Sequence, residues 1–118
     1  MRRGEIWTVS GGSAYTGKPR PAVIVQDDRF DATRSVTICS FTTSPVEAPS
    51  LRIPIEPNET NGLREPCRLM IDKITTVPRG RVGRKIGRLA PSDIVRLDRA
   101  LFVLLGIAGS RRGRRASV

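Results

Sequence analysis

The chain contains no histidine among its 118 residues. Histidine is the commonest metal ligand and the commonest general base, so its absence excludes Ser-His-Asp and Cys-His catalytic arrangements. The eleven acidic residues are scattered, and Asp27-Asp28 is their one adjacent pair. A two-metal nuclease needs clustered carboxylates, and a Walker-type nucleotide site needs a glycine-rich loop that this chain lacks. We therefore expect neither a metal nor a cofactor, and any chemistry should rest on cations and hydroxyls.

Cysteine is also scarce. The two cysteines, Cys39 and Cys67, lie within strand-like runs and form no CxxC motif. A structural disulfide is rare in the cytosol, and two separated cysteines do not make a zinc site. We expect both to be small buried thiols.

Long apolar runs are missing as well. No segment is long enough to span a bilayer, and the start of the chain, Met1-Arg-Arg-Gly-Glu, lacks the apolar region of a signal peptide. We therefore expect a cytoplasmic protein. Hydrophobic residues make up 38% of the chain and aromatic residues 4%, which suits one domain with a modest core.

Positive charge is abundant. The formal net charge is +10 and the isoelectric point is about 11.3. A terminal run supplies four of these charges, from Arg111, Arg112, Arg114 and Arg115. The rest of the chain is still basic, which indicates a polyanionic partner, nucleic acid before a membrane surface.

One stretch is central to the chain, the run Lys18-Pro-Arg-Pro-Ala-Val-Ile-Val25. Its two prolines fix their own φ angles and bias the preceding residues toward extended geometry, so Lys18 and Arg20 have little backbone freedom. The following apolar run is typical of a buried strand. Arg20 is thus expected at the mouth of a core strand, as an ordinary surface arginine or as a planar donor for phosphate.

Alternation and turn signals predict five or six short strands. Their expected ranges are 4–9, 21–26, 35–42, 51–55, 68 to about 77 with a bend, and 84–89. Pro54 places the fourth strand at a sheet edge, and Asn61-Gly62 is the strongest turn signal.

One helix is expected last. Its apolar residues, Ile94, Leu97, Leu101, Leu104 and Leu105, recur at helical spacing. Pro91, Ser92 and Asp93 favour its start and Gly106 its end. The fold class is therefore mainly β, a small bent sheet or barrel with a C-terminal helix. Residues 1–109 form the domain, and residues 110–118 are an Arg-rich tail expected to be disordered.

A candidate site follows from this order of strands. If the second and third strands are antiparallel neighbours, Arg20 at the start of one meets Thr42 at the end of the other. A guanidinium and a hydroxyl facing each other could hold a phosphate. The alternative is that Thr42, Thr43 and Ser44 are ordinary hydroxyls at a turn.

The ordered set of motifs resembles the MazF/PemK/Kid family of toxin endoribonucleases. The matching segments are Arg3-Gly-Glu-Ile-Trp7, Arg20-Pro-Ala-Val-Ile-Val25, Thr42-Thr43-Ser44, Asn61-Gly-Leu63, Ile71-Asp-Lys-Ile-Thr-Thr-Val77 and Ile86-Gly-Arg-Leu89. The resemblance covers residues 2 to about 107. It implies an SH3-like barrel, a homodimer, an antitoxin partner with an acidic disordered segment, and metal-independent cleavage of single-stranded RNA through a 2′,3′-cyclic phosphate.

By position, the resemblance makes Arg20 and Thr42 catalytic, with Thr43 as a register alternative. Lys18, Thr43 and Ser44 are expected to bind RNA. A guanidinium is a poor general base because it stays protonated, so the proton-transfer role of Arg20 is implied by the resemblance alone.

The chain also departs from the family. No acidic residue lies between Glu5 and Asp27, where many relatives carry one in the first loop. Cys67 replaces a small polar residue, and the Arg-rich tail lies outside the shared pattern. Three alternatives stay open: a non-catalytic nucleic-acid-binding barrel, a gyrase-directed toxin of the same fold, and a scaffold whose basic face binds an acidic partner.

Overall fold

A computed structural model describes residues 1–11, 18–45 and 51–107. The predicted Arg-rich tail and parts of the loops after the first and third strands lie outside these residues. The strands are β1 (Glu5–Val9), β2 (Arg20–Ile24), β3 (Ser35–Thr42), β4 (Arg52–Ile55), β5 (Cys67–Met70), β6 (Thr75–Pro78) and β7 (Val82–Arg88). The helix is α1 (Pro91–Leu104), and the short 3-10 turns are η1 (Asp28–Phe30), η2 (Ile71–Lys73) and η3 (Arg79–Arg81).

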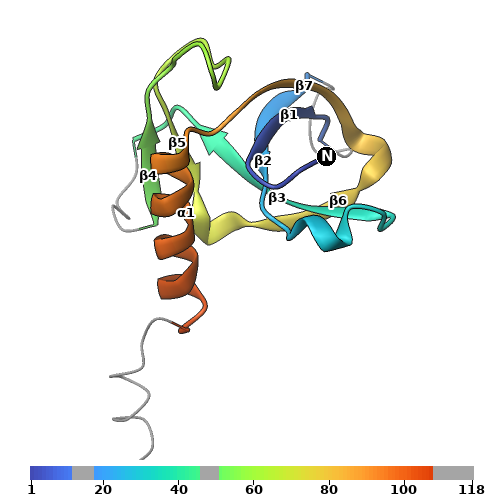
Figure 1. The fold of residues 1–118 in the computed structure, drawn as a ribbon. Helices are drawn as coiled ribbons and strands as arrows, with labels where there is room; N and C mark the ends of the chain where they lie inside the picture. The colour runs from blue at the N-terminus through green and yellow to red at the C-terminus, as the bar shows by residue number, and fades with distance from the viewer. Residues whose placement is uncertain (12–17, 46–50, 108–118) are drawn as a thin grey trace, which may run out of the picture.

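The strands form one antiparallel, strongly bent sheet (Figure 1). Its order is β4-β5-β3-β2-β1-β7, and β6 pairs with the first half of β3. Within the described chain, no pairing joins the two ends of this order. The predicted mainly β fold with a C-terminal helix is confirmed. Among the described residues, the bent sheet is not closed into a barrel by hydrogen bonds between its first and last strands. β4 lies at the edge, as Pro54 predicted.

Two apolar clusters fill the two sides of the bent sheet. The larger cluster packs under α1, which contributes the buried Leu97 and Ala100. The smaller one centres on Val36, Ile38 and Ile24 inside the bend. Successive strand residues point to opposite faces, so a central strand such as β3 serves both clusters. Both faces of the central strands are therefore buried, which fits the continuous apolar run of β2.

The predicted fifth strand, from 68 to about 77, is two strands in the structure. It divides into β5 and β6 at the turn η2, and the two pieces pair with different ends of β3. Thr42 pairs with Arg68, whereas Ile38 pairs with Thr75. The break lies at η2, where the chain passes from the last residues of β3, which pair with β5, to the first half of β3, which pairs with β6. A periodicity count cannot detect this break, because both pieces pair with the same strand.

The helix begins at Pro91, as its sequence pattern predicts, but its last turn is less buried than that pattern indicates. Ala90 is the N-cap residue, without a side-chain cap, so Ser92 lies within the first turn and does not cap. Leu104 and Leu105 are exposed, because the last turn extends beyond the sheet (Figure 1). The predicted stop is confirmed: Gly106 has a φ of 77°, and its N–H donates to the Val103 carbonyl oxygen.

The turn at Asn61-Gly62 is confirmed and braces the sheet. Asn61 is fully buried, and its side chain bonds to the backbone of Glu56, Asn58 and Leu63. The turn presses on β7 so closely that a Cβ on Gly87 would lie 2.4 Å from the Asn61 carbonyl oxygen. Glycine is therefore required at that contact.

A partly buried ion pair anchors the edge strand. Arg52 Nε lies 2.7 Å from Asp72 Oδ1, and Arg52 Nη2 lies 3.0 Å from Asp72 Oδ2. The Arg52 side chain is 9% exposed and the Asp72 side chain is 26% exposed, so the pair is partly shielded from water. The Arg52 guanidinium holds the pKa of the Asp72 carboxyl below its usual value. The pair joins β4 to η2 beneath α1.

Both cysteines are buried free thiols, as predicted. Burial raises the pKa of Cys39 to about 12. Burial, and then the nearby Glu65 and Glu56, raises the pKa of Cys67 to about 11. Neither thiol is a nucleophile at neutral pH. No helix in the described ranges is long and apolar enough to cross a membrane.

Candidate active site

Arg20 and Thr42 meet at one rim of the sheet. β2 and β3 are antiparallel neighbours, with Ala22 opposite Ser40 and Ile24 opposite Ile38. Continuing that register by two residues places Arg20, the first residue of β2, opposite Thr42, the last residue of β3. The predicted juxtaposition is therefore confirmed, although Arg20 begins the strand and does not merely precede it.

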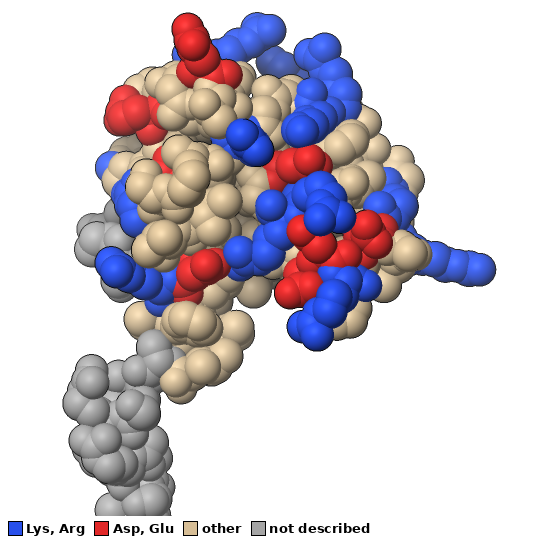
Figure 2. Space-filling view, viewed as in Figure 1, with Lys and Arg blue, Asp and Glu red and all other residues tan. Residues whose placement is uncertain are grey.

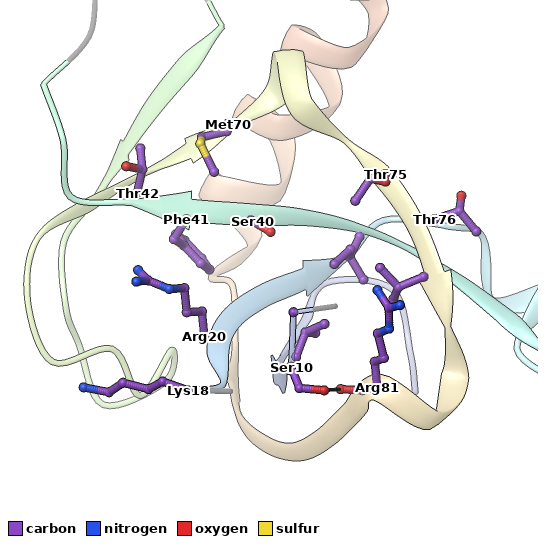
Figure 3. A pocket seen from close by; sticks show the side chains of 14 residues that line it. Ser10, Lys18, Arg20, Ser40, Phe41, Thr42, Met70, Thr75, Thr76 and Arg81 are labelled. Carbon is purple, nitrogen blue, oxygen red and sulfur yellow. Dashed lines mark hydrogen bonds between the residues drawn. The ribbon is translucent and has the colours of Figure 1, made fainter. Parts of the chain in front are cut away.

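These two residues open onto a cavity of about 420 Å³ (Figure 3). Its polar lining comes from β2, β3, β6, η3 and the two ends of the connection between β1 and β2: Ser10, Lys18, Arg20, Ser40, Thr42, Thr75, Thr76 and Arg81. Phe41, Met70 and Val77 are among the apolar lining residues. In Figure 3, Arg20 extends toward Thr42 and Phe41 at one end, and Arg81 lies at the other end. A cavity of this size and lining can hold a small polar ligand or one nucleotide.

The charge of the cavity is one-sided. Three cationic side chains line it, from Lys18, Arg20 and Arg81, and no acidic side chain of a described residue does. Elsewhere, positive and negative side chains lie interspersed (Figure 2), and ion pairs such as Arg3–Asp98, at 2.8 Å, join opposite charges. A site that gathers cations without acids attracts anions. The cavity is therefore suited to a phosphate group.

Backbone contacts hold the rim in place. Val9 pairs with Arg20 across β1 and β2. Beyond that pair, the Ser10 N–H donates to the Arg81 carbonyl oxygen at 2.9 Å, and the Ser10 hydroxyl donates to the same oxygen at 3.3 Å. These bonds tie the end of β1 to η3 across the cavity. The two outer cations, Arg20 and Arg81, therefore project from fixed backbone.

The Thr42 hydroxyl is oriented by its own chain. The Ser44 N–H donates to Thr42 Oγ1 at 3.1 Å, as in the local turns that threonine favours. An amide that donates to this oxygen leaves the hydroxyl proton available for a ligand. Thr42 is thus prepared to donate a hydrogen bond into the cavity.

The structure separates the five predicted site residues. Lys18, Arg20 and Thr42 share the first cavity. Thr43 lines a second cavity of about 220 Å³, which Thr42 also borders. Ser44 lines neither, and its described role is the amide bond to Thr42. The turn-hydroxyl reading fits Thr42, whose Oγ1 accepts from the Ser44 N–H, but Thr42 also lines the first cavity.

Sequence reasoning missed the far half of the first cavity. Arg81, Thr75 and Thr76 come from η3 and β6, which reach the site only because β6 pairs with β3. The alternation of Ser40 and Thr42 along β3 was an available signal, since residues two apart share a face. No comparable signal pointed to Arg81.

Among the described residues, no three side chains of the types His, Cys, Asp and Glu cluster closely enough to hold a metal ion. The polar side chains that line the first cavity carry cations and hydroxyls.

Comparisons with known proteins agree on one family. A sequence model described as PemK-like, MazF-like toxin of type II toxin-antitoxin system matches residues 2–105. A probable endoribonuclease MazF of Mycolicibacterium smegmatis is 62% identical over 109 residues, which is 92% of this chain and 100% of that protein. Endoribonuclease MazF9 of Mycobacterium tuberculosis is 30% identical, over 91% of this chain and 98% of its own.

Solved structures show the same fold. A mycobacterial endoribonuclease in complex with its cognate antitoxin superposes with a TM-score of 0.74, covering 91% of this chain and 96% of that one. Its sequence identity is 20%, so this likeness concerns the fold. The family match, which spans nearly the whole described chain, concerns ancestry. The chain therefore belongs to the PemK-like, MazF-like family of toxins of type II toxin–antitoxin systems.

Proposed function

We propose that this MazF-like toxin endoribonuclease cuts single-stranded RNA without a metal ion. The observation that carries the proposal is the position of Arg20 and Thr42 at the rim of a cavity whose described lining holds cations and hydroxyls but no acid. The relatives named as MazF endoribonucleases support RNA as the substrate. RNA is abundant in the cytoplasm, where we expect the protein to act.

The proposed reaction uses the nucleophile that RNA carries itself. The ribose 2′-oxygen attacks the adjacent phosphorus, and the bond from phosphorus to the 5′-oxygen breaks. The 2′-hydroxyl loses its proton, and the leaving 5′-oxygen gains one. The products are a 2′,3′-cyclic phosphate and a free 5′-hydroxyl. An enzyme for this step needs only to position the chain, stabilise charge and move protons.

Arg20 would supply the charge. Negative charge develops on the non-bridging oxygens as the 2′-oxygen adds to phosphorus, and a planar guanidinium can donate two parallel hydrogen bonds to them. Arg20 is suited to this because β2 and its flanking prolines fix its backbone. Lys18, from the same segment, would contact a neighbouring phosphate as a point charge.

Thr42 would donate a hydrogen bond to a non-bridging oxygen. The Ser44 N–H already donates to its oxygen, so the hydroxyl proton points elsewhere. Thr43, in the second cavity, would bind the RNA beside the reacting phosphate. Ser44 would assist RNA binding through its hydroxyl while its amide holds Thr42.

The decisive experiment is digestion of a long single-stranded RNA by the purified protein in EDTA. We expect discrete cuts whose 5′ ends carry hydroxyls. Binding without cleavage would favour a non-catalytic nucleic-acid-binding barrel, and inhibition of gyrase without cleavage would favour a gyrase-directed toxin. A requirement for magnesium would overturn the mechanism.

We further propose a homodimer. The final turn of α1 and the residues after it expose large apolar side chains, including Phe102, Leu105 and Ile107 at 48%, 57% and 63%. Such a cluster at one end of a small domain is typical of a protein interface. A two-fold partner of the same sequence would cover it.

The third proposed partner is a cognate antitoxin. The structural relative described above was solved in complex with its own antitoxin. An acidic, disordered segment that folds on binding would be attracted to the cationic cavity of this chain. Expression of the toxin alone should stop growth, and co-expression of the neighbouring antitoxin should restore it. Normal growth despite soluble toxin would contradict the assignment.

A further inference from the structure

The two cavities meet at Thr42. It lines both of them, and its strand, β3, is flanked at this point by β2 on one edge and β5 on the other. Thr42 pairs with Arg68, which in turn pairs with Pro54 on β4. Residues opposite each other in antiparallel strands share a face. Thr42, Arg68 and Pro54 therefore form one row across β3, β5 and β4, which leads from the Arg20 end of the first cavity into the second.

The second cavity has a different chemistry from the first. It contains one cation, Arg68, and one acid, Glu56, which lies on the same face because it is two residues beyond Pro54. Neither side chain forms an ion pair or a side-chain hydrogen bond with another described residue. Three prolines, Pro45, Pro54 and Pro66, provide rigid apolar walls. An apolar slot that presents a cation, a carboxylate and the hydroxyls of Thr42 and Thr43 suits a small planar polar group.

The backbone beneath both polar side chains is fixed. The Glu56 carbonyl oxygen accepts a 2.8 Å hydrogen bond from Nδ2 of the fully buried Asn61. Arg68 lies within β5, with ladder partners on both sides. A site preformed in this way loses little conformational entropy when it binds a ligand.

A carboxylate weakens the binding of a polyanion. Close to phosphates it would repel the substrate, so a role in holding the RNA backbone does not explain Glu56. A carboxylate does match the exocyclic amino group of a base, to which it is an acceptor, as in the pairing of Glu or Asp with cytosine N4. Specific recognition of single-stranded RNA reads such base edges on splayed-out nucleotides.

We propose that the second cavity is a base-recognition subsite for a nucleotide next to the cleaved phosphate. Glu56 accepts a hydrogen bond from the exocyclic amino group of cytosine, adenine or guanine, and Arg68 donates to the neighbouring ring nitrogen or carbonyl oxygen. Uracil has no exocyclic amino group, and its N3–H is flanked by two carbonyl oxygens that the Glu56 carboxylate repels, so uracil is disfavoured at this position. The inference rests on the proposed ribonuclease function and specifies one element of its sequence preference.

The test measures base preference at each position around the cut. The cut sequence is first found by sequencing the 5′ ends of products from a long RNA. Short RNAs that carry each of the four bases at every flanking position are then digested by wild type, Glu56→Gln and Arg68→Gln. Glu65→Gln and Arg64→Gln are matched controls, because both residues are exposed and line neither cavity.

We expect wild type to disfavour uracil at one flanking position. Glu56→Gln should reduce that discrimination by about tenfold at that position alone, because an amide can also donate to a uracil carbonyl. Arg68→Gln should alter preference at the same position, and the two controls should leave the profile unchanged.

Two results would overturn the inference and are distinguishable from failure of the proposed function. If wild type cuts RNA but both cavity variants keep its base profile, the second cavity does not read bases. If wild type prefers uracil at every flanking position, the assigned chemistry is wrong. If wild type cuts no RNA at all, the ribonuclease function fails, and the inference fails with it.

Discussion

Arg20 and Thr42 stand opposite each other at the ends of β2 and β3, two residues beyond the pair Ala22–Ser40. The paired strands thus hold a cation and a hydroxyl at the rim of one cavity. Groups on neighbouring strands are held more rigidly than groups on loops. Catalysis by fixed donors needs such rigidity, because stabilisation of a transition state depends on donors that do not have to reorganise.

Replacing Arg20 should abolish most of the activity without unfolding the protein. Arg20→Ala removes the planar donor beside Thr42, and loss of a positioned charge-stabilising or proton-transfer group typically costs about 10² to 10⁴ in rate. Arg20→Lys should recover little, since an ammonium cannot form the paired hydrogen bonds. Cleavage of single-stranded RNA in EDTA measures the effect. Arg34→Ala, an exposed arginine outside both cavities, is the control.

Circular dichroism should show that the Arg20 variants fold, because the burial of β2 comes from Ala22, Val23 and Ile24. A folded Arg20→Ala protein that cuts at the wild-type rate would place the active site elsewhere.

Thr42 and Thr43 should differ in their effects. Thr42→Ala removes the hydroxyl that faces the first cavity and should lower turnover, whereas Thr42→Ser should retain part of it. Thr43→Ala should change RNA binding more than turnover, since Thr43 lines only the second cavity. Separate measurement of kcat and KM distinguishes the two. A larger loss of kcat in Thr43→Ala than in Thr42→Ala would reverse the assignment.

The local half of this site could be predicted from the sequence. The prolines around Arg20 and the apolar run after it indicate a buried strand, and β3 begins and ends at its expected residues. Two such strands joined by a short polar connection pair antiparallel, which brings Arg20 to Thr42. The reasoning uses only contacts between neighbours in the chain.

The distant half could not be predicted. Arg81 reaches the first cavity because η2 splits the expected fifth strand and returns β6 to β3. Arg68 and Glu56 line the same cavity because β4 and β5 pair, and the buried Asn61 holds the turn between these two strands. Both events depend on tertiary packing, which overrides strand propensity.

Acid should weaken the protein through Glu5. Burial by itself would raise its pKa, yet hydrogen bonds from the Arg2 amide and the Trp7 indole, together with Lys85, lower it to about 2 from 4.5. A group with a lowered folded-state pKa stabilises the fold above its unfolded pKa, and this contribution is lost as the pH falls through the folded value. The loss attributable to Glu5 should therefore occur between about pH 4.5 and 2.

Glu5→Gln should be less stable than wild type at pH 7 by about 2 kcal/mol, since hydrogen bonds to a charged group are lost. The difference should shrink as the pH falls below 4.5. Urea unfolding at several pH values measures it, with the exposed Glu59→Gln as control. A difference that stays constant down to pH 2.5 would show that the charge of Glu5 is irrelevant.

The apolar end of α1 should control oligomeric state. Phe102→Lys places a charge in the exposed cluster with Leu105 and Ile107 and should convert a dimer to a monomer at micromolar concentration. Phe30→Lys makes the same change at another exposed phenylalanine, 52% accessible on η1, and should leave the dimer intact. Sedimentation velocity gives the result. A wild-type protein that sediments only as a monomer would contradict the homodimer.

The Arg-rich tail should strengthen RNA binding without changing where the RNA is cut. Arg111, Arg112, Arg114 and Arg115 lie outside the described residues and outside the residues that the family model matches. Each phosphate that they neutralise should steepen log K against log salt by about 0.7 on a single strand, so four contacts would add up to about 2.8. Deleting residues 110–118 should therefore flatten the salt dependence measured by fluorescence anisotropy. The cut sites should not move, because phosphate contacts carry no sequence information. Replacing the four arginines by lysines keeps the charge and serves as the control. A deletion variant that cuts at new sequences would show that the tail reads bases.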